Sequence, residues 1–316
     1  MKPHRLGIAL CALSACGFGA MAVFAKEAYG EGVGVLTLLP VRFGLAAALF
    51  WVIVLARGAR LPSRRALLTG LALGAGGYAA QAGLYFGALT RIDASLTALL
   101  LYIYPVLVFA GALALRREHV SVVRIGALVL ACGGTALVLA TGGALGAVDG
   151  LGLAMALAAA VFYAAYILIA DRLVAEVDPF VLAALLCTGA AGSLLATGVG
   201  AGSFDLGFAA GGWGWIALLA FGSTVLGITC LLAGLRLVGP ATASIVSTIE
   251  PAVTVGLAVA VYAEPLGPGR LLGGALVLAA VVLLQRREGT VAGDDPASVA
   301  ARPAPARALA HEPARG

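Results

Sequence analysis

The chain has 316 residues, of which 62 % are hydrophobic and only 11 % are charged, and its mean hydropathy is +1.05. Soluble domains are nearer half apolar and a quarter charged, so this composition excludes an ordinary water-soluble core and indicates an integral membrane protein. The net charge of +5 comes from short basic clusters between apolar runs, which argues against a nucleic-acid-binding surface.

Ten apolar runs are long enough to be membrane-spanning helices, which need about 20 residues each. We therefore expect an all-α integral membrane protein with ten transmembrane helices and short connections. In chain order the predicted helices cover residues 6–25, 35–56, 66–89, 94–115, 121–141, 150–170, 180–200, 213–235, 241–261 and 269–285.

The basic residues of the connections predict the orientation. With the N-terminus in the cytoplasm, 13 Lys and Arg residues fall on the cytoplasmic side, and only Lys26, Arg91 and Arg270 fall outside. Because cytoplasmic loops carry the excess of basic residues, we expect a multi-pass protein of the inner (plasma) membrane with both termini cytoplasmic. Residues 288–316 are rich in Ala, Pro and Arg without an apolar period, which predicts a disordered cytoplasmic tail.

The sequence holds little that would support catalysis or metal binding. Its five cysteines lie singly in apolar runs, and its three histidines are far apart, so we expect neither a disulfide framework nor a metal site. It has no nucleotide-binding loop and no hydrolase motif. We therefore expect no cofactor and no enzymatic activity.

An internal repeat relates the two halves of the chain. Shifting the sequence by 146 residues places Pro105 on Pro251 and Glu118 on Glu264. Each half then has five helices, and because five is odd, the second half enters the membrane from the opposite side. Inverted repeats of this kind place a transport site near the midplane of the membrane. The predicted repeats cover residues 6–141 and 150–287.

Several motifs, taken in order, resemble the EamA-type transporters of the drug/metabolite transporter superfamily. They are FAKEA in the first predicted helix, PVRFGLAAAL in the second, and STIEPAV followed by AEPL in the ninth. The resemblance covers about residues 6–287 and implies a ten-helix transporter of two EamA repeats, often an exporter of amino acids or other small metabolites. The family commonly has Glu before Pro in the ninth helix, which Glu250 and Pro251 match, whereas Tyr104 stands at the equivalent place in the first repeat.

Glu250 is the first candidate for a functional residue. A charged side chain at a helix centre costs around 3 kcal/mol on insertion scales, and such residues usually face the bundle interior or a wet cavity. Glu250 shares a helix face with Ser247, and Pro251 leaves the Ser247 carbonyl free or bound to water. We expect Glu250 and Ser247 to bind substrate or a proton in a transport cavity. The alternative is a structural Glu250 bonded to a neighbouring helix.

Other polar side chains lie inside the apolar runs. Tyr78, Gln81 and Tyr85 share one face of the third helix, which predicts either a pocket wall or an interhelical hydrogen bond. Tyr104, before the helix-breaking Pro105, is either a substrate contact or a packing residue.

Arg42 lies about 10 Å from the outer end of the second predicted helix. Its side chain can reach outward to the interface, hold a substrate carboxylate, or form a structural or gating pair, which we favour. We interpret Lys26 as an interface anchor, and Tyr163 and Tyr166 as packing residues. Glu118 and Glu264 are expected to cap the next helix or to pair with Arg124 and Arg270.

The sequence thus predicts a secondary transporter that exports amino acids or other small metabolites by alternating access, with proton coupling through Glu250 as one hypothesis. Its expected partners are a small-molecule substrate and membrane lipid, without nucleic acid, and it would act as a monomer or a homodimer. The alternatives are a lipid flippase and a structural or sensory membrane protein without transport.

Overall fold

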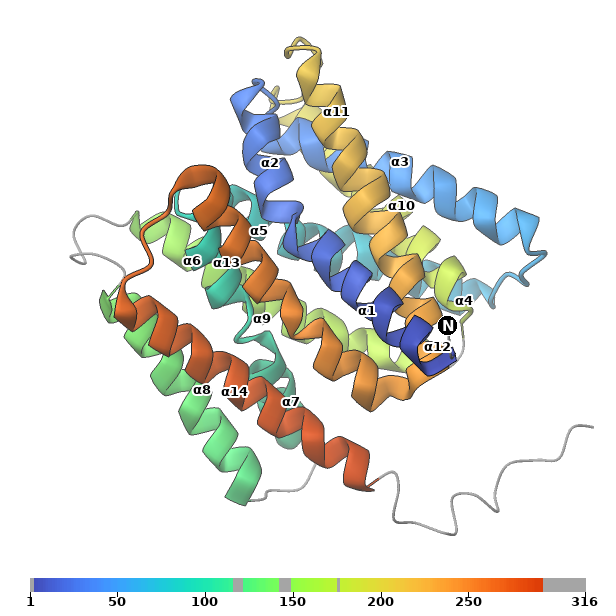
Figure 1. Cartoon of the computed structure of the whole chain (residues 1–316). Coiled ribbons are helices and arrows are strands. Elements are labelled where there is room, and N and C mark those ends of the chain that lie inside the picture. Colours follow the sequence, from blue (N-terminus) through green and yellow to red (C-terminus); the bar gives the residue numbers. More distant parts are fainter. Residues whose placement is uncertain (1–2, 116–121, 142–148, 175–176, 292–316) are drawn as a thin grey trace, which may run out of the picture.

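The computed structural model describes residues 3–115, 122–141, 149–174 and 177–291, and every regular element in these residues is a helix (Figure 1). This agrees with the predicted all-α fold. The helices are α1 Pro3–Gly19, α2 Met21–Gly30, α3 Val35–Ala56, α4 Arg64–Leu73, η1 Gly74–Tyr78, α5 Ala79–Leu89, α6 Ala94–Leu101, α7 Tyr104–Ala114, α8 Val122–Thr141, α9 Gly150–Val174, α10 Pro179–Gly200, α11 Gly211–Ala217, η2 Leu218–Leu226, α12 Gly227–Ser247, α13 Ile249–Tyr262 and α14 Pro268–Val291.

Six helical stretches of the described chain are long and apolar enough to cross a membrane: Pro3–Gly30, Val35–Ala56, Ala94–Ala114, Gly150–Ala170, Pro179–Gly200 and Gly211–Gly239. Three shorter apolar helices, Ile125–Val138, Ile249–Tyr262 and Pro268–Leu283, accompany them. Each of the ten predicted runs falls on a helical segment. That all ten cross the membrane remains a prediction.

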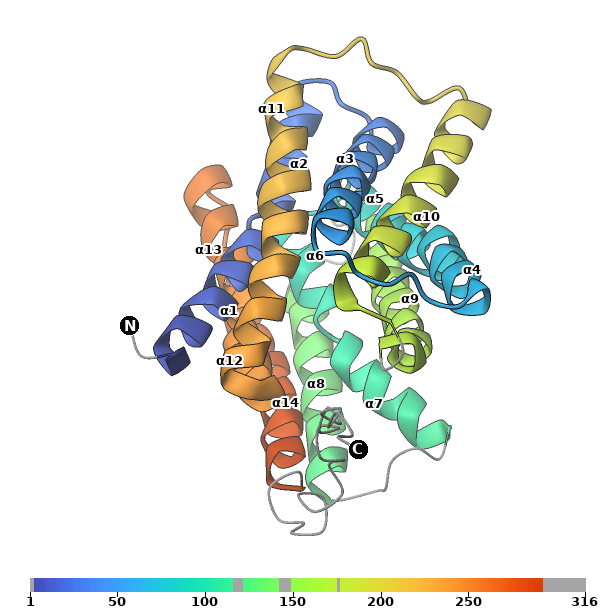
Figure 2. The ribbon, with the colours of Figure 1, turned by 90° about the vertical axis from the view of Figure 1, so that its right-hand side faces the viewer.

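Helices from the first and second halves of the chain pack side by side. The largest contacts join α8 to α14, α1 to α12 and α3 to α10 (Figures 1 and 2). Glycines allow this close approach, since a Cβ added to Gly134 in α8 would lie 2.7 Å from the carbonyl oxygen of Gly273 in α14. Small residues at such contacts are typical of membrane helices, where van der Waals packing drives association.

Two helix breaks occupy equivalent places in the two halves. The regular α-helix is interrupted by a turn at Tyr102–Ile103, between α6 and α7, and again at Thr248, between α12 and α13, while the backbone stays in or near the right-handed helical region. Tyr102 and Thr248 are 146 residues apart, and each break lies just before a proline, Pro105 or Pro251. Proline cannot donate the backbone hydrogen bond that would continue the helix, which explains both positions.

Two π-helical segments are also equivalent, and the sequence pattern did not predict them. The first segment, η1, ends at Tyr78, and the second, η2, contains Thr224, 146 residues later. A π-helical turn inserts a residue into the helix and frees backbone carbonyls, and such turns are frequent at functional sites. Tyr78 of η1 lines the cavity described below, and Thr224 of η2 accepts a hydrogen bond from Arg42, which also lines it.

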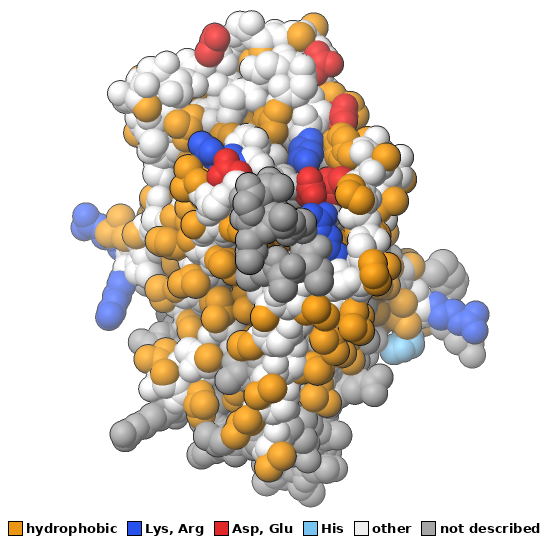
Figure 3. All heavy atoms as spheres, turned by 90° about the vertical axis from the view of Figure 1, so that its left-hand side faces the viewer, with side chains coloured by type: hydrophobic (Ala, Val, Ile, Leu, Met, Phe, Trp, Pro, Cys, Tyr) orange, Lys and Arg blue, Asp and Glu red, His pale blue; other side chains and the backbone are white. Residues whose placement is uncertain are grey.

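Acidic side chains, with several basic ones beside them, lie toward one end of the bundle, beyond a surface with many hydrophobic side chains (Figure 3). There the buried Glu264 accepts hydrogen bonds from the backbone N–H groups of Ala94 and Ser95 at the start of α6, and it pairs with Lys26 at 3.5 Å. Glu264 therefore caps a helix of the other half of the chain, whereas we expected it to cap the helix that follows it or to pair with Arg270. Arg270 pairs with Asp93 at 2.9 Å.

Two expectations fall partly or wholly outside the described residues. Glu118 and the side chain of Arg124 lie outside the described part of the chain, so their predicted capping and pairing stay predictions. Helix α14 continues to Val291, beyond the predicted end of the second repeat at residue 287. The rest of the predicted tail, 292–316, is outside the described part of the chain.

Candidate functional site

A cavity of about 470 Å³ lies between the two halves of the chain. It extends from Arg42 and Phe86 at one end to Pro179, the first residue of α10, and Leu235 at the other. All seven side chains predicted to bind substrate or a proton line this cavity. They are Arg42, Tyr78, Gln81, Tyr85, Tyr104, Ser247 and Glu250.

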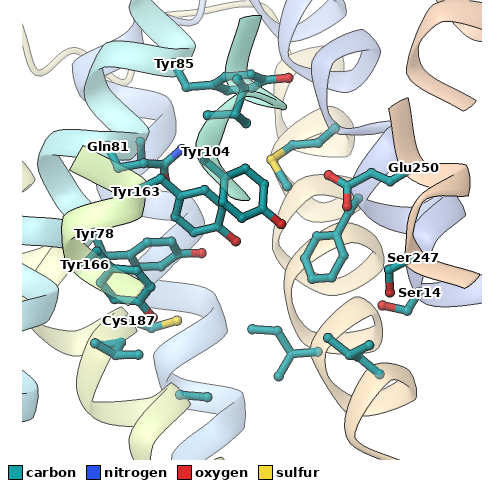
Figure 4. Close-up of a pocket in the computed structure, with 18 of the residues that line it drawn as sticks. Ser14, Tyr78, Gln81, Tyr85, Tyr104, Tyr163, Tyr166, Cys187, Ser247 and Glu250 are labelled. Atoms are coloured by element: carbon teal, nitrogen blue, oxygen red, sulfur yellow. The ribbon is translucent and has the colours of Figure 1, made fainter. Parts of the chain in front are cut away.

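One wall of the cavity is a row of tyrosine rings (Figure 4). The centroids of Tyr104 and Tyr163 lie 4.4 Å apart, those of Tyr163 and Tyr166 lie 6.0 Å apart, and those of Tyr166 and Tyr78 lie 5.6 Å apart. Stacked and tilted rings at these distances stabilise one another and form a rigid wall. Figure 4 shows the hydroxyls of Tyr78, Tyr104 and Tyr163 directed into the cavity.

The opposite wall carries Ser14, Ser247 and Glu250 (Figure 4). Glu250 lies in the first turn of α13, and Tyr102 lines the cavity with it. Helix α13 is held against α1 at this point, because Thr254 donates to the carbonyl of Gly19 at 2.9 Å. A Cβ on Gly19 would lie 2.8 Å from the Glu250 carbonyl oxygen, so the absence of a side chain at Gly19 allows this contact.

The Ser247 carbonyl, which we expected to be free or bound to water, has a protein partner. It accepts a hydrogen bond from the Tyr102 hydroxyl at 3.3 Å. The break before Pro251 thus exposes a carbonyl, and a tyrosine at the equivalent break of the other half binds it. The Ser247 hydroxyl itself donates to the carbonyl of Ala243 at 2.9 Å.

Arg42 does not reach outward to the interface, which was one of its expected roles. It is 1 % exposed and lies at the cavity wall, where its Nε donates to the Thr224 hydroxyl of η2 at 2.9 Å. The rings of Phe43 and Phe86 each lie 5.0 Å from the guanidinium carbon. The structural or gating pair that we favoured stays a prediction: in the described part of the chain the contacts of Arg42 are a hydroxyl and two aromatic rings.

Sequence reasoning missed several cavity residues. Tyr163 and Tyr166 were assigned to packing, although their spacing of three residues placed both on one helix face. Tyr102 would lie on a different face from Tyr104 in a regular helix, so the helix break is what brings both to the cavity. Ser14 and Cys187 carried no signal in the sequence, because single small residues are common in any membrane helix.

The sequence model of the EamA-like transporter family matches this chain twice, at residues 5–140 and 150–286. The chain belongs to this family. The two matches fall on the two predicted halves, so the EamA-like transporter has the two-repeat architecture of its family. A comparison with curated proteins finds no match.

A solved structure, described only as "Crystal structure of protein", has a similar fold. The TM-score is 0.63 at 20 % sequence identity, over 89 % of this chain and 98 % of the other. This likeness concerns the fold alone. Membership of the family makes the protein a multi-pass membrane protein of a family of small-molecule transporters, which are transporters rather than enzymes.

Proposed function

We propose that this EamA-like protein is a secondary transporter that exports amino acids or other small metabolites across the cytoplasmic membrane by alternating access. The observation that carries the proposal is the cavity between the two halves, in which a single carboxylate, Glu250, faces a wall of tyrosine hydroxyls. A cavity of about 470 Å³ lies in the range of sites for small molecules.

The direction of the cavity supports uptake of substrate from the cytoplasm. Its lining reaches Pro179 and Leu235, near connections that the basic residues predict to be cytoplasmic. Toward the predicted outer face, no residue of the connections 31–34, 90–93, 201–210 or 263–267 lines it. In an exporter, a cavity that reaches toward the cytoplasm would be the state that loads substrate.

The equivalent breaks at Tyr102–Ile103 and Thr248 support alternating access. Both breaks border the cavity, and a hydrogen bond from Tyr102 to Ser247 joins them. Interrupted helices at the interface of two inverted repeats are typical of transporters in which one half moves against the other around a fixed site.

Glu250 is proposed to act in the transport cycle, either as a proton acceptor or as a contact for a substrate ammonium. Its carboxylate lines the cavity beside tyrosines, and among the described residues no ion pair involves it. A carboxyl group with neutral partners can bind and release a proton as its surroundings open and close, which suits coupling.

The test is counterflow by purified protein in proteoliposomes, with a panel of amino acids, nucleosides and sugars. Glu250→Gln keeps the shape of the side chain and removes its charge, and Asp205→Asn in an outer connection is the control. If Glu250 couples protons, pH-driven transport by Glu250→Gln falls at least tenfold while exchange is retained. If it binds ammonium, exchange falls as well.

Wild-type rates of both activities in Glu250→Gln would show that the residue is structural. Movement of labelled lipid without counterflow of any compound in the panel would favour the flippase alternative and contradict the proposal.

A further inference from the structure

Arg42 is a buried cation whose hydrogen-bonding capacity is mostly unused. A guanidinium has five N–H donors, and the Nε donor is bonded to Thr224 at 2.9 Å. In the described part of the chain, no hydrogen bond or ion pair involves either terminal nitrogen, Nη1 or Nη2. Four N–H donors therefore lie at the wall of the cavity without an acceptor.

The neighbours of Arg42 lower the cost of its burial without satisfying these donors. A cation over an aromatic face gains about 2 kcal/mol when both are desolvated, and the rings of Phe43 and Phe86 each lie 5.0 Å from the guanidinium carbon. Neither ring accepts a conventional hydrogen bond, and a guanidinium carries its N–H donors in its own plane. A planar anion that accepts two parallel N–H bonds in that plane would complete the site.

We propose that Arg42 binds the carboxylate of the transported substrate. This rests on the proposed transport function and assigns the chemical class of the substrate. The bond to Thr224 fixes the rotation of the guanidinium, so its outer edge is oriented before the substrate arrives. Lys could not replace Arg42 fully, because its ammonium lacks the planar fork.

The same cavity holds the complementary charge. Glu250, Tyr85 and Arg42 all line it. A substrate with one ammonium and one carboxylate would satisfy both ends. The rest of the lining includes tyrosine rings and aliphatic side chains such as Leu186 and Leu232. The inferred substrate class is therefore a zwitterionic amino acid with an apolar side chain.

The test measures binding by isothermal titration calorimetry to the full-length protein in lipid nanodiscs. Two matched series are used: leucine, 3-methylbutylamine and 4-methylpentanoate, and phenylalanine, phenethylamine and 3-phenylpropanoate. Each series compares a zwitterion with the same molecule lacking its carboxylate or its amine. The variants are Arg42→Gln, Arg42→Lys and Glu250→Gln.

We expect Arg42→Gln to weaken binding of the amino acid and the carboxylic acid at least tenfold and to leave binding of the amine unchanged. Glu250→Gln should give the opposite pattern, with the amino acid and the amine weakened and the acid unchanged. Arg42→Lys keeps the charge and should weaken the same two ligands as Arg42→Gln, to a smaller degree. If Arg42→Gln does not fold, the comparison of Arg42→Lys with the wild type supplies the test.

A structural Arg42 would lower the affinity for all three ligands of a series together, and this result would overturn the inference. Binding of the amine by the wild type as tightly as the amino acid would overturn it too. If neither series binds while a nucleoside or sugar is exchanged in proteoliposomes, the inference fails and the transport function stands. Absence of both binding and counterflow would overturn the inference and the proposed transport function together.

Discussion

Gly74 in η1 lies directly against the backbone of Leu186 in α10. A methyl group added to Gly74 would meet the Leu186 Cα at 2.8 Å and its carbonyl oxygen at a shorter distance still. Gly189, one turn further along α10, makes the reciprocal approach to the Leu71 carbonyl. The π-helical segment and α10 are therefore in backbone contact beside the cavity wall.

We predict that Gly74→Ala destabilises the protein by about 1–3 kcal/mol, because overpacking at such a contact forces the backbone to shift. Gly76→Ala is the matched control, since a Cβ at Gly76 meets nothing within 4 Å in the same segment. Thermal unfolding of the purified variants, followed by tryptophan fluorescence, measures the difference. Equal melting temperatures for the two variants would contradict the tight contact.

Cys187 offers a native probe of the cavity. It is 1 % exposed but lines the cavity, whereas Cys11 is buried between helices and does not line it. In variants that keep one cysteine each, we expect a small methanethiosulfonate to modify Cys187 from the predicted cytoplasmic side and to leave Cys11 unmodified. Labelling is read by mass spectrometry on inside-out and right-side-out vesicles. Equal labelling of Cys187 from both sides would argue against a cavity that opens toward the cytoplasm.

The predicted orientation has its own test. Cysteines placed at Asp149 and Asp205 should react with an impermeant maleimide added to intact cells, and a cysteine at Arg64 should not, because the excess of Lys and Arg marks the cytoplasmic side. Permeabilised cells provide the control, in which all three sites should react. Reaction at residue 64 in intact cells would reverse the orientation.

Two carboxylates at the charged end should differ in their effect on stability. Glu264 is buried and accepts hydrogen bonds from Ala94 and Ser95, so Glu264→Gln should lower the melting temperature, since a hydrogen bond to a buried charged group contributes about 1.5–3 kcal/mol. Asp149 forms an exposed ion pair with Arg91 at 2.8 Å, and Asp149→Asn should change the melting temperature little at neutral pH. An equal effect of both substitutions would refute the contrast.

The pH dependence of the exposed pair follows from its geometry. The hydrogen bond from Arg91 and two backbone N–H groups lower the pKa of Asp149 below its ordinary value of 3.8. A lowered pKa means that the pair stabilises the fold above the ordinary pKa and loses this effect as the pH falls through the lowered value. The small difference in melting temperature between wild type and Asp149→Asn should therefore disappear as the pH falls through the lowered pKa of Asp149, and high salt should reduce this difference at neutral pH.

The sequence was sufficient for the main features of the fold because they follow from composition and length. Ten apolar runs predicted ten helical segments, and the shared offset of Pro105 and Pro251 anticipated two equivalent helix breaks. Few polar side chains lie within those runs, so seven of them could be chosen as candidate lining residues. All seven line the cavity.

The remaining features depended on contacts between distant segments, which periodicity does not report. The π-helical geometry of η1 and η2 has no signal of its own, because Gly-rich and Leu-rich stretches are equally compatible with a regular helix. The hydrogen bond of Arg42 to Thr224 of η2 could not be predicted, because the two residues are 182 positions apart in the sequence. For the same reason, the capping of α6 by Glu264 could not be predicted from the residues that neighbour α6 or Glu264 in the sequence.

The depth of the cavity also decides where the membrane voltage acts. In the predicted orientation, a cavity filled by cytoplasmic solution keeps Glu250 near the cytoplasmic potential, and the electric field falls mainly across the packed layer above Arg42. Protonation of Glu250 in this state would then be nearly independent of voltage. If Glu250 instead stays charged without a counter-ion while the protein changes to an outward-open state, the free energy of that conformational change would depend on voltage. The dependence is about 2.3 kcal/mol per 100 mV for a charge that crosses the whole field.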